Sequence, residues 1–229
     1  VVDRSAVARE FAARYPADER TIAEALAPVE RQLEAEAPVP TDHRIVVEGQ
    51  GRQVVLNAAY GHTVNETLGR MLAALLGQQT ESSVALDADP YRIELEVPRN
   101  VRVADVREVL ETTEPDHVRT LLELALKRSD ALKFRLAQVA AKFGTLKRYQ
   151  GDGHFGADRL MAALEDTPVY EEAVREIFHE VLAVEEAAEV LADIQSGEID
   201  LVTARELTPI GTAGRTGAQE FLVPENADA

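Results

Sequence analysis

The residues of this 229-residue chain most suited to chemistry are its lysines, because they are few and lie together. All four fall within 21 consecutive residues: Lys127, Lys133, Lys142 and Lys147. The window 119–148 holds eight Lys or Arg against two acids, a net charge of +6 in a chain whose formal charge is −17. Ammonium and guanidinium groups bind phosphates and carboxylates. The cluster therefore indicates contact with nucleic acid or with the acidic remainder of the fold.

The spacing of apolar residues predicts that these charges lie on a helix over 130–148. A stripe with steps of four, three, four and three faces the core: Leu132, Leu136, Val139, Phe143 and Leu146. Arg135 and Lys142 flank this stripe, whereas Phe134 points away from it. Basic groups beside a free aromatic ring suit single-stranded nucleic acid, since phosphates follow the charges and bases stack on the ring. The predicted nucleic-acid-binding residues are Lys127, Arg128, Lys133, Phe134, Arg135, Lys142, Lys147 and Arg148.

A second interpretation of the same segment needs no ligand. The helix would be solvated, its charges would pair with nearby carboxylates, and Phe134 would pack on a neighbouring element. The residue types and their spacing leave both interpretations open.

The sequence contains no motif that predicts a catalytic or cofactor-binding site. There is no cysteine, which excludes disulfides, thiolate metal sites and a cysteine nucleophile. The five histidines are scattered, so no zinc site is expected, and acidic pairs are too abundant to single out an acid–base dyad. Gly151–Gly156 spells GxGxxG, but a predicted helix precedes it where a dinucleotide-binding motif needs a strand, so we predict a loop. No GxxxxGK[ST] phosphate loop occurs.

Composition indicates a globular protein of one large or two small domains, with 45% hydrophobic residues. Acidic residues are spread along the chain and arginine outnumbers lysine 20 to 4, which resembles proteins of high-salt cytoplasm. The longest apolar run, Met71–Leu76, is far shorter than a membrane span, and the N-terminus has no hydrophobic signal core. We therefore expect a cytoplasmic protein without membrane contact. The first residue is Val, which suggests an excerpt of a longer chain.

Hydrophobic periodicity divides the chain into four segments. Residues 1–40 form two helices, 41–100 a β module, 101–197 a helical bundle that carries the basic helix, and 198–229 a short strand with a flexible tail. The predicted class is α+β. A small, mostly antiparallel sheet or barrel with an inserted helix packs against a larger helical bundle.

The β module is predicted from two pairs of β-branched runs. Runs 43–49 and 52–59 join at Gly49–Gly51, a hairpin signal, and runs 83–87 and 91–97 are separated by Asp89-Pro90. The helix between the pairs is expected over 63–77, opened by a Thr63–Glu66 capping box and ended by Gly77.

Five stretches, in this order and spacing, carry a family resemblance: Val64–Arg70, Asp89–Ile93, Leu136–Arg148, Thr167–His179 and Ser196–Ile199. Together they resemble the DEAD/H-associated region of the Lhr (large helicase-related) family of superfamily 2 helicases. The resemblance covers residues 40–215. The five stretches in register, rather than any one of them, carry the resemblance.

The resemblance implies that this chain is the C-terminal accessory part of an ATP-dependent helicase that moves 3′-to-5′. Two RecA-like domains of the same polypeptide would bind ATP and Mg²⁺, a winged helix would follow, and this region would help to enclose the single strand of DNA or RNA. The chain itself has no Walker motif and no DExH box, so no cofactor is expected in it. It also lacks tryptophan, so base stacking would fall to Phe134, Tyr149 or another ring.

Three functions are consistent with these observations, and the first is favoured. In the first, the chain is a non-catalytic module that guides a single strand for an ATP-driven translocase. Alternatively, it is a protein-interaction module that docks on the RecA-like or winged-helix domains. The third possibility is an enzyme that acts on nucleic acid by itself, a glycosylase or nuclease, which the missing metal cluster and acid–base site disfavour.

Overall fold

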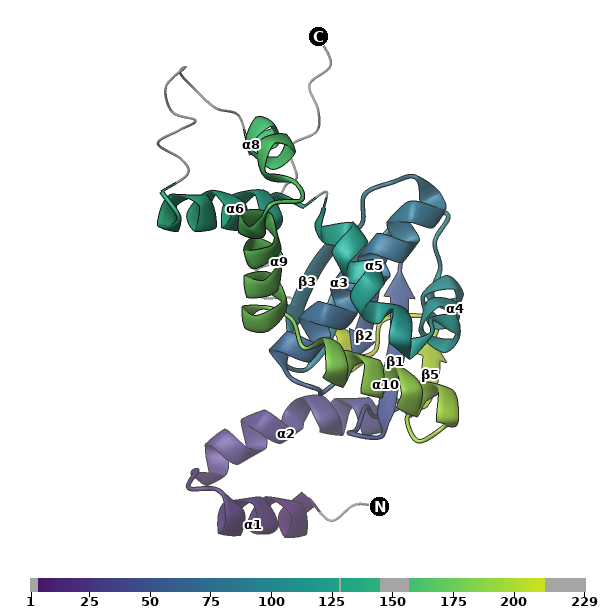
Figure 1. Ribbon diagram of the computed structural model, residues 1–229. Coiled ribbons are helices and arrows are strands. Elements are labelled where there is room, and N and C mark those ends of the chain that lie inside the picture. Colours follow the sequence, from purple (N-terminus) through teal and green to yellow (C-terminus); the bar gives the residue numbers. More distant parts are fainter. Residues whose placement is uncertain (1–3, 128, 145–156, 213–229) are drawn as a thin grey trace.

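One open, five-stranded sheet forms the centre of the computed structural model, which describes residues 4–127, 129–144 and 157–212 (Figure 1). The strand order is β3-β4-β2-β1-β5. The strands are β1 (Arg44–Gln50), β2 (Gln53–Asn57), β3 (Ala85–Asp89), β4 (Arg92–Glu96) and β5 (Asp200–Ala204). Only β5 runs parallel to its neighbour, β1, and the other pairs are antiparallel. The predicted α+β class with a mostly antiparallel sheet is confirmed, and the sheet does not close into a barrel.

The longer helices of the described residues fall into three groups. Two N-terminal helices precede the sheet: α1 (Arg4–Arg14) and α2 (Glu19–Glu34). Those that pack on the sheet or on one another beside it are α3 (His62–Thr80), α4 (Val103–Thr112), α5 (Val118–Leu126, after the 3₁₀ turn η1 at Pro115–His117) and α10 (Val184–Ser196). The third group packs on itself: α6 (Asp130–Lys142), α8 (Ala157–Leu164) and α9 (Pro168–Glu180). Figure 1 shows this third group projecting to one side of the sheet.

The main core lies between one face of the sheet and α3. Alternate residues of the central strands, such as Ile45, Leu56 and Ile93, are buried on this face against the apolar side of α3. Gly69 lets helix and sheet approach closely, because a Cβ there would come within 3.0 Å of Ile93 Cγ2 and nearer still to Leu86 Cδ1. A larger residue at this contact would require the Leu86 and Ile93 side chains to shift, so glycine favours the close packing of α3 on the sheet.

The opposite face of the sheet buries a carboxylate beneath the short helix α11 (Pro209–Thr212). Glu48 is fully buried there and accepts hydrogen bonds from the Asn57 amide and the Thr208 backbone N–H. The Ile210 N–H donates to buried Gln32 of α2 over 3.0 Å. The segment around α11 therefore connects the sheet to the N-terminal helices.

Two local predictions for the β module were wrong. The turn between β1 and β2 lies at Gly51-Arg52 rather than at Gly49–Gly51, because Gly49 pairs with Val54 inside the ladder. Helix α3 begins at His62 after Gly61, without a side-chain cap, and continues past Gly77 to Thr80. The capping box fails because the predicted Thr63 cap is already helical.

The basic helix is shorter than predicted. α6 ends at Lys142, because Gly144 adopts φ +69, the left-handed conformation that terminates helices. Phe143 is 59% exposed and so leaves the core stripe that its spacing predicted. Leu146, like the predicted loop at Gly151–Gly156, lies outside the described residues. Among the described helices, none is long and apolar enough to cross a membrane.

Candidate functional site

Helix α6 carries the described part of the predicted nucleic-acid-binding segment and is held by an apolar stripe. Ser129 caps its N-terminus, since the Ser129 hydroxyl accepts a hydrogen bond from Leu132 N over 3.2 Å. Leu132, Leu136 and Val139 are fully buried, and α6 packs on α8 and α9. The first three positions of the predicted stripe are therefore confirmed. They fix which side chains of α6 face outward.

Two of the predicted site residues, Arg135 and Lys142, bind carboxylates of α9. Arg135 Nη1 lies 3.1 Å from Glu176 Oε2 and 2.6 Å from Glu180 Oε2. Lys142 Nζ lies 3.0 Å from Glu176 Oε1. Both side chains thus fasten α6 to α9, as the second interpretation of the basic helix expected. Arg135 is 21% exposed in this position, which leaves it little surface for another ligand.

The protonation of this cluster follows from its geometry. Lys142, and then Arg135, hold the pKa of the Glu176 carboxyl below its ordinary value. The hydrogen bond to Glu180 raises the pKa of Arg135. These contacts thus stabilise the charged forms of Glu176 and Arg135 at neutral pH.

The other predicted residues have different environments. Phe134 points away from the buried stripe, as predicted, and is 68% exposed. Lys127 is exposed at the C-terminus of α5, and Lys133 is partly buried beside Phe134. Arg128, Lys147 and Arg148 lie outside the described residues, as does Tyr149. The structure therefore gathers Lys127, Lys133 and Phe134 near the start of α6, with Arg135 and Lys142 turned to α9.

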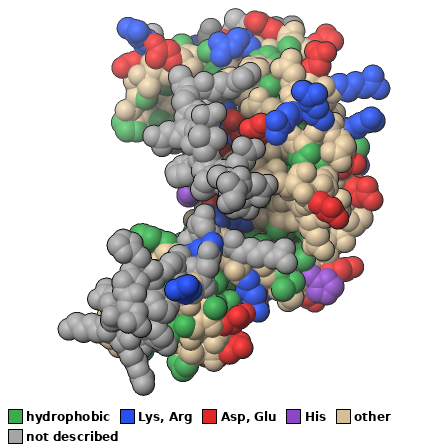
Figure 2. All heavy atoms as spheres, turned by 90° about the horizontal axis from the view of Figure 1, so that it is seen from above, with side chains coloured by type: hydrophobic (Ala, Val, Ile, Leu, Met, Phe, Trp, Pro, Cys, Tyr) green, Lys and Arg blue, Asp and Glu red, His purple; other side chains and the backbone are tan. Residues whose placement is uncertain are grey.

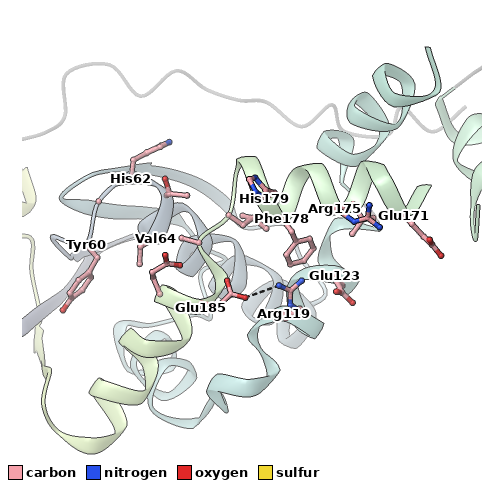
Figure 3. A pocket seen from close by; sticks show the side chains of 16 residues that line it. Tyr60, His62, Val64, Arg119, Glu123, Glu171, Arg175, Phe178, His179 and Glu185 are labelled. Carbon is pink, nitrogen blue, oxygen red and sulfur yellow. Dashed lines mark hydrogen bonds and ion pairs between the residues drawn. The ribbon is translucent and has the colours of Figure 1, made fainter. Parts of the chain in front are cut away.

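A groove of about 830 Å³ lies between the N-terminus of α3 and helices α5, α9 and α10 (Figure 3). Its apolar lining includes Val64, Val174 and Phe178. Tyr60 stands at one end, and burial raises the pKa of its phenol to about 12. The Tyr60 hydroxyl therefore stays protonated at neutral pH. It donates a hydrogen bond to the Asp42 carbonyl.

Arg119 holds one wall of the groove together. Its guanidinium lies 5.0 Å from the centre of the Phe178 ring, a cation–π contact, and Nη2 lies 3.2 Å from Glu185 Oε1. Figure 3 shows the Arg119–Glu185 pair between α5 and α10. The pKa of Glu185 is lowered, first by a hydrogen bond from the backbone N–H of Glu185 itself and then by the hydrogen bond from Arg119. Arg119 is therefore engaged on two sides.

The groove was not foreseen from the sequence. Its residues come from four elements separated by up to 126 positions, Tyr60 to Glu186, and form no local motif. Arg119 lies in the basic window, Thr63 in the expected capping box, and Val64 and five residues of α9 in the stretches that carry the family resemblance, but none of them was predicted to line a site. Figure 2 shows Lys and Arg side chains interspersed with Asp and Glu over the upper face of the molecule, so this face is not uniformly basic.

Comparison with known proteins places the fold in a family. Residues 39–211 match the DEAD/H associated family, and the chain belongs to it. Two relatives are named ATP-dependent helicase Lhr-Core: one from Saccharolobus solfataricus is 27% identical over 75% of this chain, and one from Sulfolobus acidocaldarius is 25% identical over 72%. The chain spans about a fifth of their length, 21% and 20% respectively.

A solved structure shares the fold. The Mycobacterium smegmatis helicase Lhr, bound to single-stranded DNA and AMP-PNP, superposes on this chain with a TM-score of 0.72 and 19% identity. The superposition covers 93% of this chain and 29% of that one. The family match and the Lhr-Core relatives, together with this shared fold, confirm the resemblance to the DEAD/H-associated region of Lhr-like helicases that the sequence carries.

Proposed function

We propose that this chain is the accessory, non-catalytic module of an ATP-dependent Lhr-like helicase and contacts the single strand at the start of α6. The observation that carries the proposal is Phe134, a ring 68% exposed in the segment that holds every lysine of the chain. Lys127 and Lys133 are the described lysines of this surface, which we call the Phe134 surface. Family membership and a relative with bound single-stranded DNA support it.

The chemistry of the Phe134 surface suits a strand of any sequence. An exposed ring offers a stacking face to each base, and lysines contact the backbone as point charges. Arg135 and Lys142 contribute indirectly, because they hold α6 against α9 and so keep Phe134 turned outward. ATP and Mg²⁺ would be bound by RecA-like domains elsewhere in the parent polypeptide.

The test is binding of a labelled single strand of about 20 nucleotides, DNA or RNA, measured by fluorescence anisotropy. Phe134→Ala should weaken binding by about 5- to 150-fold, because base–aromatic stacking contributes about 1–3 kcal/mol per base. Lys127→Ala should reduce the slope of log affinity against log salt by about 0.7. Tyr91→Ala is the matched control, since Tyr91 is 73% exposed but lies at the β3–β4 turn.

If Phe134→Ala and Tyr91→Ala lower the affinity equally, or if neither lowers it, the single-stranded nucleic acid does not bind at α6. Arg135→Ala and Lys142→Ala are unsuitable as binding tests, because they also break the contacts between α6 and α9. A folded wild type that binds neither DNA nor RNA would favour the second candidate.

That second candidate is a module that docks on the RecA-like or winged-helix domains of the same polypeptide. It is favoured by the ion pairs of Arg135 and Lys142, which direct two predicted phosphate contacts into the fold. In the described part of the chain we find no residue set that favours a glycosylase or nuclease.

A further inference from the structure

The groove between α3, α5, α9 and α10 has the length and periodicity of a helix-binding site. Along α9 its lining residues are Glu171, Val174, Arg175, Phe178 and His179. Their steps of three, one, three and one place them on one helical face. From Glu171 to His179 the groove follows α9 for about 12 Å, at 1.5 Å per residue, and Leu182 extends it. A groove of this shape matches more than two turns of an added helix.

The lining combines an apolar strip with a charged rim. Val64 of α3 and Val174 of α9 are partly exposed, so apolar surface is available to a ligand. Figure 3 shows Val64 and Phe178 within the groove, with Glu171 and Glu123 at its end. Amphipathic helices bind such grooves through apolar residues spaced three and four apart.

The rim selects the charge of the ligand. Four carboxylates and two guanidinium groups line the groove, a net charge of −2 with both histidines neutral. The Arg119 charge is matched by Glu185, and that of Arg175 by Glu172, which lies 2.5 Å away and outside the groove. Within the described part of the chain, the exposed carboxylates Glu123, Glu171 and Glu186 form no ion pair.

A phosphate backbone would meet this rim with like charge, which opposes binding. A basic ligand would be attracted to it. Of the basic ligands, an amphipathic helix also covers the apolar strip along α9. We propose that the groove is a docking site for an amphipathic helix of a protein partner, with apolar side chains toward Val64 and Val174 and lysine or arginine toward the rim. The proposal does not depend on whether α6 binds nucleic acid.

The probe is a fluorescein-labelled synthetic peptide of leucine and lysine in amphipathic helical order, with a leucine–glutamate peptide as its counterpart. The full chain should bind the first and not the second. Val174→Glu should weaken binding about tenfold or more, because a carboxylate in the apolar strip blocks the leucines. This variant adds negative charge, so a merely electrostatic complex would tighten instead. Val174→Thr should give a smaller loss of the same sign.

Rim charges are tested against a matched pair of carboxylates outside the groove. Glu123→Gln with Glu186→Gln should lower the affinity and its salt dependence. Asp87→Asn with Glu206→Gln changes the net charge equally and should leave binding unchanged, because both residues are exposed away from the groove. Circular dichroism confirms the fold of each variant.

Three outcomes would overturn the proposal. Val174→Glu could bind the leucine–lysine peptide as well as the wild type does, or better. The two double variants of carboxylates could also change the affinity equally. Either result would show that the complex is non-specific. Labelled single-stranded DNA, added without the peptide, could bind the wild type and lose that binding with Val174→Thr, which would assign the groove to nucleic acid.

Discussion

The substitution Gly211→Ala tests whether the buried carboxylate of Glu48 fixes the position of α11, which connects the sheet to the N-terminal helices. A Cβ at Gly211 would come within 2.9 Å of Glu48 Oε2 and nearer still to Oε1. Ordinary contacts of a Cβ begin near 3.4 Å. Glu48 is fully buried and fixed by Asn57, so α11 must move away. The Thr208 N–H would then lose its bond to Glu48.

The cost follows from the charge of the acceptor. A hydrogen bond to a charged group contributes about 1.5–3 kcal/mol, and a buried carboxylate that loses one is not rehydrated. We expect Gly211→Ala to lower the free energy of unfolding by about 2–3 kcal/mol, within the range for hydrogen bonds to charged groups. For a domain of this size each kcal/mol lowers Tm by about 2–4 °C, so Tm should fall by about 4–12 °C.

Calorimetry and urea denaturation measure the effect. Hydrogen exchange at Ile210 should also quicken, because its N–H donates to Gln32 of α2. Thr212→Ser is the control in the same helix: Thr212 is exposed, serine keeps the hydroxyl that donates to the Thr208 and Pro209 carbonyls, and the loss should stay within about 0.5 kcal/mol. An unchanged Tm for Gly211→Ala would refute the reasoning, since it would mean that Glu48 does not limit the position of α11.

Two further predictions concern α6. Leu136→Ala should lower the free energy of unfolding, measured by urea denaturation, by about 2–5 kcal/mol because Leu136 is fully buried. Phe134→Ala should lower it by less than about 0.5 kcal/mol, and equal losses for the two variants would contradict the orientation of the helix. The lowered pKa of Glu176 means that its ion pairs stabilise the fold above its ordinary pKa of 4.5 and are lost as the pH falls through the lower folded value. The difference in Tm between wild type and Glu176→Gln should therefore shrink as the pH falls below 4.5, and a difference that grows with acid would show the opposite linkage.

Local pattern determined the elements of this protein. The periodicity of α6 placed Leu132 and Leu136 inward and Phe134 outward, because burial in a helix repeats with its turn. The β-branched runs located four strands within a few residues, and β5 followed from a short run near the C-terminus. The concentration of lysine also identified the segment whose surface Phe134 occupies. The local pattern placed two boundaries wrongly. At the turn between β1 and β2, Gly49 and Gly51 lie close together, and the wrong residues were assigned to the turn. At Gly144, the apolar spacing of α6 continues beyond the point where the helix ends.

Tertiary structure decided which charges remain available. Arg135 pairs with Glu176, 41 residues away, and Arg119 with Glu185, 66 residues away. Nothing in the spacing of either arginine distinguishes a carboxylate partner from a phosphate, because both ligands bind the same group in the same geometry. The groove and the buried Glu48 arise likewise from elements far apart in the chain, the bond from Thr208 spanning 160 positions. A charge can be located from the sequence, but its partner depends on packing between elements, which local periodicity does not encode.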